Sequence, residues 1–312
     1  MFPGEFDYRR ATSVEEALDL LATHGDSGAE TVIIAGGHGL LPEMKAREAT
    51  PEVVVDVSDL DDLRGIEAGE APDEPTVVGA LTTHATLADS PVVRDSATVV
   101  SEAASAVGDT QIRNRATVGG NLVEAHPAAD LPAAMVAADA TLALVGRDGE
   151  RTVPAEEFFR GDGDTAVEDG DPAIENDELL TEIRVPSAPA AGGAYAKKTH
   201  PASGFALVGV AASVAVTDWT VTAARVVASG ATSAPARLRS VEDALVGRSA
   251  DRDTITDATE GAGDELDADE VRSDATASAA FRTHLLSSYA ERALTTAVDR
   301  ATGRAVDRGR QQ

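Results

Sequence analysis

Two glycine pairs are the residues of this sequence best suited to hold an anion. One pair, Gly36–Gly37, lies in the segment AGGHG (35–39), and the other, Gly119–Gly120, lies in TVGGN (117–121). Each segment closes or interrupts a stretch with strand character, where glycine permits a positive φ and a close approach of backbone N–H groups to a ligand. A lone Gly-Gly more often makes only a tight exit from a strand. The occurrence of two such segments predicts a pyrophosphate cradle built from two loops.

The sequence lacks the other common motifs of nucleotide and catalytic sites. Neither glycine segment fits GxGxxG followed by a helix and a distant acid, GxxxxGK[ST] is absent, and so is the GxSxG elbow of serine hydrolases. No two histidines have the His-x-x-His spacing of a metal site. His38 and His126 are interpreted as hydrogen-bonding loop residues rather than catalysts. We therefore assign no catalytic side chain and no metal ligand.

The cysteine content and the net charge limit the cofactors and partners that this chain can bind. The 312 residues include no cysteine, so any cysteine-ligated iron-sulfur cluster must lie on a partner. The balance of 26 basic against 54 acidic residues gives a net charge of −28, which disfavours nucleic acid and anionic membranes as partners. Acidic excess with only three lysines, Lys45, Lys197 and Lys198, resembles the proteins of salt-loving microbes, in which salt screens self-repulsion.

The sequence contains no signal for export or membrane insertion. The N-terminal residues lack a charged start followed by an apolar core, and no run of about eighteen apolar residues is free of charge. We expect a cytoplasmic protein without membrane insertion.

Hydrophobic periodicity in the first half predicts an α+β fold rather than a barrel. Residues 13–24 have helical spacing, with Ser13 and Glu16 placed as a capping box. Runs of β-branched residues predict short strands at 31–35, 53–57 and 76–80, and a hairpin of 141–145 with 151–153. Helical spacing returns at 83–87, 92–107 and 131–138.

The second half predicts a sheet with helices on one face. Residues 161–177 are rich in Gly and Asp and are expected to form a solvated surface loop, and 186–193 an interdomain linker. Apolar strands are expected at 206–216 and 220–229, followed by helices at 240–246 and 251–262 and a last helix that begins near Ala275. The acidic run 264–270 is interpreted as a solvated face.

Several spaced motifs resemble one known family. They are GDTQIRNRATVGGNL (108–122), HPAADLP (126–132) and AGGHGLLP (35–42), with further matching segments at 6–8, 79–84, 205–212 and 281–285. Together they resemble the FAD-binding medium subunit of the molybdenum hydroxylases, of the carbon monoxide dehydrogenase or xanthine dehydrogenase type. The resemblance covers essentially the whole chain.

The resemblance implies a fold and a function. The fold would be a two-part FAD-binding domain of the vanillyl-alcohol oxidase (PCMH) type, at 1–58 and 59–186, followed by a smaller α+β domain at 187–312. FAD would take electrons from iron-sulfur clusters on a small subunit and pass them to an external acceptor, while a large subunit with molybdopterin oxidises the substrate. The complex would be a dimer of heterotrimers. A non-redox scaffold and a self-contained flavin oxidase remain as alternatives, and the substrate and acceptor stay unassigned.

The resemblance also implies cofactor-binding residues. The backbone of 35–39 would hold the FAD diphosphate, and 117–121 would complete the cradle. Asp130 would contact the adenosine portion, Leu180 or its neighbour Leu179 would line the flavin or adenine pocket, and Lys197 or Lys198 would lie near the flavin ring. The full set is Ala35, Gly36, Gly37, His38, Gly39, Thr117, Val118, Gly119, Gly120, Asn121, Asp130, Leu180, Tyr195 and Lys197.

Two departures from the family pattern concern the same site. Gly39 stands where a serine is common, which removes a hydroxyl that could contact phosphate. Residues 200–204 (HPASG) replace a basic pair followed by Gly-Asp before Phe205. Because of these departures, the residues at the edge of the flavin and the route by which an acceptor reaches it stay unassigned.

Overall fold

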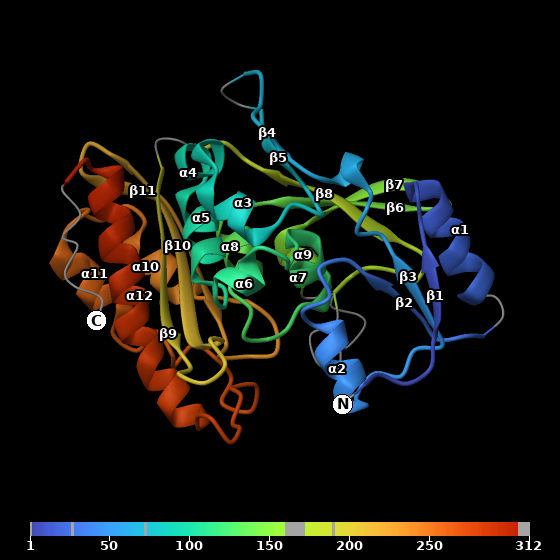
Figure 1. Ribbon diagram of the computed structural model, residues 1–312. Coiled ribbons are helices and arrows are strands. Elements are labelled where there is room, and N and C mark those ends of the chain that lie inside the picture. Colours follow the sequence, from blue (N-terminus) through green and yellow to red (C-terminus); the bar gives the residue numbers. More distant parts are fainter. Residues whose placement is uncertain (1, 26–27, 72–73, 160–171, 189–190, 305–312) are drawn as a thin grey trace.

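Three β-sheets follow one another along an elongated molecule. The computed structural model describes residues 2–25, 28–71, 74–159, 172–188 and 191–304. A three-stranded sheet lies at one end, a four-stranded sheet with the long C-terminal helix lies at the other, and a five-stranded sheet with several short helices lies between them (Figure 1). Helices and strands are mixed in each part, which confirms the predicted α+β class.

The first sheet is parallel, with β3 (Val53–Asp56) between β1 (Asp7–Arg10) and β2 (Thr31–Ile34). The helices α1 (Val14–Gly25) and α2 (Leu40–Ala46) make the crossovers that parallel strands require. All four residues of β3 are buried, whereas β1 is an exposed edge. The hydroxyl of Ser13 caps α1 by accepting from Glu16 N at 3.1 Å, and the Glu16 carboxylate accepts from Thr12 N. The Glu16 carboxylate therefore accepts from the N–H of Thr12, one residue before the N–H of Ser13 that the predicted capping box requires.

The second sheet is antiparallel, in the order β4 (Ile66–Glu67), β5 (Thr76–Gly79), β8 (Leu179–Val185), β6 (Thr141–Gly146) and β7 (Gly149–Pro154). The hairpin of β6 and β7 confirms the predicted one. A large core is shared by this sheet and the neighbouring helices. The helices that contribute to it are α3 (His84–Asp89), α4 (Pro91–Ser96), α5 (Thr98–Ala106), α7 (Val118–Glu124), α8 (Leu131–Ala137) and α9 (Ala155–Phe158). The short helix α6 (Thr110–Arg113) and the 3-10 turn η1 (Asp61–Leu63) lie outside this core.

The single helix predicted at 92–107 is divided in two. Ala97 leaves the helical conformation, with φ −151° and ψ 69°, and separates α4 from α5. The preceding Ser96 is buried, and its hydroxyl lies 3.1 Å from that of Thr76 in β5. The hydrogen bond anchors the end of α4 to the sheet at the point where the chain turns.

The third sheet is an antiparallel meander in the order β12 (Ala236–Arg237), β11 (Thr220–Ser229), β10 (Ala206–Thr217) and β9 (Ala191–Thr199). The strands predicted around 218–219 are confirmed. β9 begins at Ala191, so the predicted linker at 186–193 is too long. Gly192 lies within this strand. A Cβ there would overlap the carbonyl oxygen of Ala297 in the C-terminal helix, so glycine allows the strand and the helix to approach closely.

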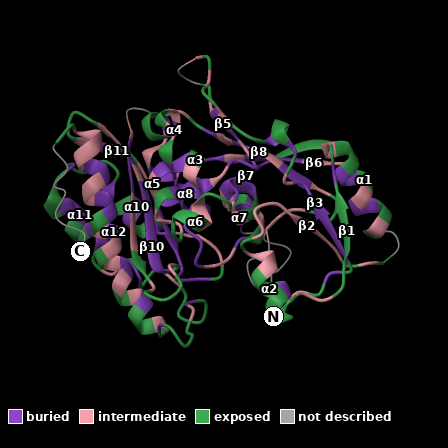
Figure 2. Cartoon of the chain, in the orientation of Figure 1, coloured by how far each residue is buried: buried purple, intermediate pink, exposed green. Residues whose placement is uncertain are grey.

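Helices cover both faces of the third sheet. Its own helices, α10 (Arg239–Leu245), α11 (Arg252–Thr259) and α12 (Ala279–Ala301), share a core with Val210 and Ala212 of β10. The intervening Ala211 faces the other way and belongs to the core of the second sheet, where α5 and α8 contact β9, β10 and β11. The sequence predicts helices on one face only, whereas both faces of this sheet are covered. The buried stripe of α12 is visible in Figure 2.

The last helix begins later than predicted. Residues 274–277 form a turn in which the Asp274 carboxylate accepts from Thr276 N at 2.8 Å and from Ala277 N at 3.1 Å. Ser278 then caps α12 by accepting from Phe281 N at 3.3 Å. The acidic residues of the run 264–270 are exposed, as predicted. Residues 161–171 of the predicted surface loop lie outside the described residues.

Candidate functional site

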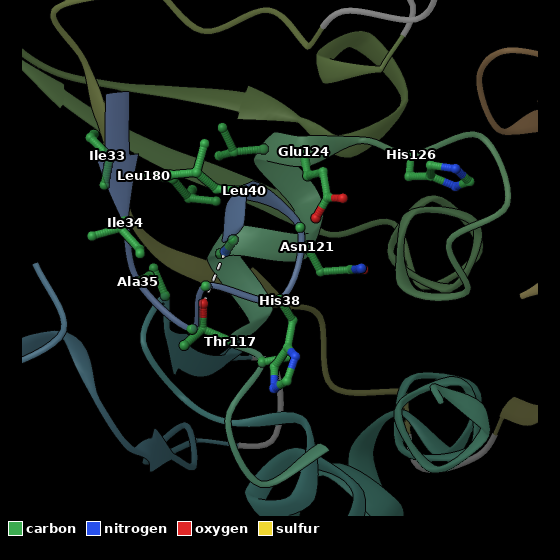
Figure 3. A pocket seen from close by; sticks show the side chains of 18 of the residues that line it. Ile33, Ile34, Ala35, His38, Leu40, Thr117, Asn121, Glu124, His126 and Leu180 are labelled. Carbon is green, nitrogen blue, oxygen red and sulfur yellow. Dashed lines mark hydrogen bonds between the residues drawn. The ribbon is translucent and has the colours of Figure 1, made fainter. Parts of the chain in front are cut away.

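Both glycine segments line one cleft of about 530 Å³. One wall comes from β2 and the turn that leads into α2, and the opposite wall comes from α7 and the start of β8 (Figure 3). The residues 203–205 of the turn between β9 and β10 also line it. Segments far apart in the sequence thus form a single concave site, the usual geometry for a small ligand or cofactor.

The first glycine segment packs directly against the chain that precedes the second. A Cβ at Gly36 would lie 2.5 Å from the carbonyl oxygen of Arg115 and 2.8 Å from Cα of Ala116. Gly37 has φ +74°, a conformation that residues with a side chain rarely adopt. Two separate requirements, close backbone contact and a positive φ, therefore explain this glycine pair.

The second glycine segment is helical, which corrects the strand character expected for it. Thr117 is the N-cap of α7, and its hydroxyl accepts from Gly120 N at 3.2 Å (Figure 3). A Cβ at Gly119 would lie 2.7 Å from the Cβ of Ala80, and Gly119 N donates to Ala80 O at 2.7 Å. The glycine allows the first turn of the helix to lie on the backbone that follows β5.

Asn121 presents an unpaired polar atom at the cleft. Its Oδ1 is buried and has no hydrogen-bond partner among the described residues. The side chain projects into the cleft in Figure 3. Because buried amide oxygens are nearly always hydrogen-bonded, this atom indicates a position where a ligand or water donates a hydrogen bond.

His84 supports the second wall, a role that sequence reasoning missed. Its ring is fully buried, and Nε2 lies 3.1 Å from the carbonyl oxygen of Thr117. Burial lowers the pKa of His84 to about 4, so the ring is neutral near pH 7 and Nε2 carries the donated hydrogen. The only sequence signal was its place at the end of the matching segment 79–84.

Asp130 lines the cleft and is held from behind by two residues of β9. Its Oδ1 accepts from the hydroxyl of Tyr195 at 2.6 Å, and its Oδ2 accepts from Lys197 Nζ at 2.8 Å. Burial raises the pKa of Asp130, and the ammonium of Lys197 opposes that shift. Burial also raises the pKa of Tyr195 well above its usual range. The carboxylate is thus positioned from the C-terminal domain.

Lys197, which the resemblance places near the flavin ring, does not itself line the cleft. Its side chain is 5% exposed and also donates to the carbonyl oxygen of Ala106 at 2.8 Å. The buried ammonium instead lies behind Asp130, because that carboxylate supplies its counter-charge. Lys198 is exposed on the other face of the strand, so Lys197 is the lysine that reaches this region.

The other predicted residues divide between cleft and core. Val118 is fully buried in the core and does not line the cleft. Tyr195 is partly buried and does not line the cleft either. Leu179 and Leu180 both contribute to the wall. The remaining predicted positions on the wall are Ala35, Gly36, Gly37, His38, Gly39, Thr117, Gly119, Gly120, Asn121 and Asp130.

Two further segments complete the cleft. Ile174, Glu175 and Asn176 line it, so the described end of the predicted surface loop forms part of the wall rather than a purely solvated segment. At another point the rings of His126 and Phe205 are stacked, with centroids 4.4 Å apart and an interplanar angle of 20°. Burial lowers the pKa of His126, which keeps this ring pair uncharged near neutral pH.

The charged side chains that the structure describes on the cleft wall are all carboxylates. Asp130 is paired with Lys197, and Glu178 with Arg151 at 2.6 Å, but neither basic residue reaches the wall itself. The other acidic residues there are Glu43, Glu124 and Glu175. An anionic ligand would therefore be held by backbone N–H groups and amide side chains.

Known protein families match the chain over most of its length. Residues 4–188 match the family described as the FAD binding domain in molybdopterin dehydrogenase. Residues 193–297 match the family described as the CO dehydrogenase flavoprotein C-terminal domain. The boundary between the two matches falls at the end of the second sheet and the start of β9.

Individual relatives align over most of both chains. The protein is 33% identical to caffeine dehydrogenase subunit beta of Pseudomonas sp. (strain CBB1), over 99% of this chain and 100% of the relative. It is 35% identical to the carbon monoxide dehydrogenase medium chain of Hydrogenophaga pseudoflava, over 84% and 87%. A solved structure of carbon monoxide dehydrogenase from Hydrogenophaga pseudoflava, lacking the Mo-pyranopterin moiety of the molybdenum cofactor, superimposes with a TM-score of 0.87 at 32% identity, over 96% and 99%.

Proposed function

This chain belongs to the family of FAD-binding medium subunits of molybdenum hydroxylases, and from that premise we propose how its cleft serves the function. The cleft binds FAD, and the chain acts as the electron-transfer subunit of an oxidoreductase complex. One observation carries the assignment of the site: two glycine segments pack against each other along one cleft, next to an unpaired buried amide oxygen on Asn121. These residues fit the diphosphate and hydroxyl groups of a dinucleotide.

The chain's own residues bind and orient the cofactor. The backbone N–H groups of 35–39 hold the diphosphate, 117–121 completes the cradle, Asp130 accepts from the adenosine portion, and Leu179 and Leu180 provide apolar contact. The N–H groups of 118–121 already donate within the chain, so the second segment contributes the shape of the wall and the side chain of Asn121. Tyr195 and Lys197 act through Asp130 by fixing its carboxylate. When bound, FAD supplies the redox chemistry: it collects electrons from iron-sulfur clusters of a partner and passes them to an external acceptor.

The partners are a large subunit with the molybdenum cofactor and a small iron-sulfur subunit. The relatives carry subunit names, medium chain and subunit beta, and this chain spans nearly their whole length. Without cysteine it offers no thiolate for a cluster of its own. We propose that the assembly is a dimer of heterotrimers. The names of the relatives include both carbon monoxide and caffeine dehydrogenases, so similarity alone does not choose a substrate.

The proposed domain division is 1–58, 59–186 and 187–312. It is supported by the three sheets, because each of these ranges contains the strands of one sheet. The first two ranges would together bind FAD, since the cleft takes residues from both.

The net charge of −28 supports a cytoplasmic protein of a salt-rich cell. We expect its melting temperature to rise between dilute buffer and molar KCl, because salt screens the repulsion among surface carboxylates. An unchanged melting temperature would refute this part of the proposal. Within the described residues, no helix is long and apolar enough to cross a membrane.

Flavin binding by the purified chain tests the function. The wild type should take up FAD and show flavin absorbance, whereas Gly120→Trp should abolish uptake, because the indole would fill the cleft beside Thr117. Gly25→Trp is the matched control, since Gly25 is exposed at the end of α1 with open space around it. A wild-type chain that stays colourless with FAD, or equal uptake by the Gly120 variant, would contradict the assignment of this cleft.

A further inference from the structure

Glu124, the last residue of α7, places a carboxylate in the cleft beside the first glycine segment. A Cβ at Gly39 would overlap this carboxylate, so the absence of a side chain at 39 makes room for it. Figure 3 shows Glu124 directed across the cleft toward the 35–39 segment, on the same side as Asn121. An acidic group therefore borders the cradle assigned to the diphosphate.

Glu124 differs in its surroundings from Asp130 and Glu178, the two paired carboxylates of the wall. Asp130 is neutralised by Lys197, and Glu178 is neutralised by Arg151. Among the described residues no Lys or Arg forms an ion pair with Glu124, and the charge that acts on its pKa is that of another carboxylate, Glu43. Partial burial and the charge of Glu43 both raise the pKa of Glu124. Negative charge at this point is already unfavourable before any ligand enters.

We propose that Glu124 is an electrostatic gate on cofactor loading: its carboxylate opposes the FAD diphosphate, and monovalent cations that neutralise it strengthen FAD binding. The inference rests on the proposed function of the cleft. Like charges a few ångströms apart repel strongly where protein displaces water, and dissolved salt weakens that repulsion. FAD affinity should therefore increase with KCl, although charge-assisted binding of an anion ordinarily weakens as salt is added.

Fluorescence titration of the flavin-free full chain with FAD tests the gate. Wild type, Glu124→Gln and Glu48→Gln would be titrated between about 0.1 and 2 M KCl, with circular dichroism recorded at each concentration to establish that the chain is folded. Glu48→Gln is the matched control, because Glu48 is an exposed carboxylate after α2, outside the cleft, and its loss changes the net charge equally. Glu124→Asp keeps the charge but withdraws it by one methylene.

The expected outcomes separate the variants. At the lowest salt Glu124→Gln should bind FAD about ten-fold more tightly than wild type, and its affinity should rise less steeply with KCl than that of wild type. Glu48→Gln should retain the wild-type salt dependence, and Glu124→Asp should retain most of it. If Glu124→Gln binds no more tightly at low salt, or follows the same salt dependence as Glu48→Gln, the gate is refuted while the FAD site stands. If no variant binds FAD at any salt concentration, the function proposed for the cleft fails and the gate fails with it.

Discussion

The two glycine segments use the same residue pair for different structural purposes. In 35–39, the glycines leave a strand, adopt a positive φ at Gly37 and approach the backbone of 115–117. In 117–121, they form the first turn of α7, which Thr117 caps and which lies on Ala80. Gly36 of the first segment is constrained by main-chain contacts that no side-chain substitution can relieve. Gly119 of the second is limited by both the Cβ and the carbonyl oxygen of Ala80, so a change at Ala80 can relieve part of its constraint.

Substitution in the first segment should have the largest effect. Gly36→Val would push its side chain into the backbone of Arg115 and Ala116, and we expect a loss of about 3 kcal/mol in the free energy of unfolding together with loss of FAD binding. Denaturant unfolding and FAD titration measure the two effects. Gly25→Val serves as the control at an open position. Near wild-type FAD affinity in the Gly36 variant would show that the two loops are not rigidly packed.

The second segment should be sensitive to acid through His84. A folded-state pKa near 4, below the usual value of 6.5, means that the unfolded chain binds more protons between these pH values, so this stability contribution is complete above pH 6.5 and is lost as the pH falls toward 4. Each pKa unit corresponds to about 1.4 kcal/mol, so the loss is at most about 3.5 kcal/mol.

His84→Gln tests the acid sensitivity. The amide keeps an uncharged N–H donor for the Thr117 carbonyl but cannot take up a proton in this pH range. Unfolding measured in steps between pH 7 and 4 should therefore show a shallower loss of stability for the variant than for wild type. Identical slopes would indicate that His84 titrates normally in the folded chain.

A compensated change should distinguish the segments. Gly119→Ala brings its Cβ within 2.7 Å of the Cβ of Ala80, and we expect a loss of about 1–2 kcal/mol. Ala80→Gly in the same chain should recover part of the loss, because it removes that carbon. The free energies of unfolding of both single variants and the double variant give the coupling. If the two free-energy changes are strictly additive, the backbone of Ala80 rather than its Cβ limits Gly119, just as backbone atoms limit Gly36.

The smallest effect concerns the helix caps. Thr117→Ala removes the side-chain cap of α7 and should cost about 1 kcal/mol, with a corresponding weakening of FAD binding. α2 has no such cap, because its N-cap is Gly39. Gly39→Ser supplies a hydroxyl there, but its Cβ overlaps the Glu124 carboxylate, so stabilisation should appear only together with Glu124→Ala, which removes the overlapping atoms. A stabilising effect of Gly39→Ser alone would show that Glu124 moves aside freely.

The sequence predicts the elements whose signal is local. β10 and β11 combine apolar, β-branched residues with a turn at Asp218–Trp219, and the sequence predicts both strands. α7 escapes the same reasoning because it has only seven residues, two of them glycine, and depends on its cap and on contact with residues 80–82. Gly192 suggests a flexible linker from composition alone, yet it is a strand residue that lets α12 approach closely.

The candidate site divides in the same way. Glycine segments are recognisable from their letters and spacing, so the sequence predicts that both belong to one site. The position of Lys197 depends on which carboxylate lies opposite β9, and the ring of His84 depends on the pairing of residues 80–84 with 116–119. Contacts of this kind join segments that are tens of residues apart, and no local pattern encodes them.

The cover of the third sheet by α5 and α8 has a consequence for cooperativity. Ala211 and Val227 of that sheet belong to the same core as the middle helices, and Asp130 is joined to Tyr195 and Lys197 across the boundary. Although two families match separate stretches of the chain, each stretch buries part of its apolar surface against the other. The sequence modules should therefore melt together, as one calorimetric transition, rather than as two independent domains.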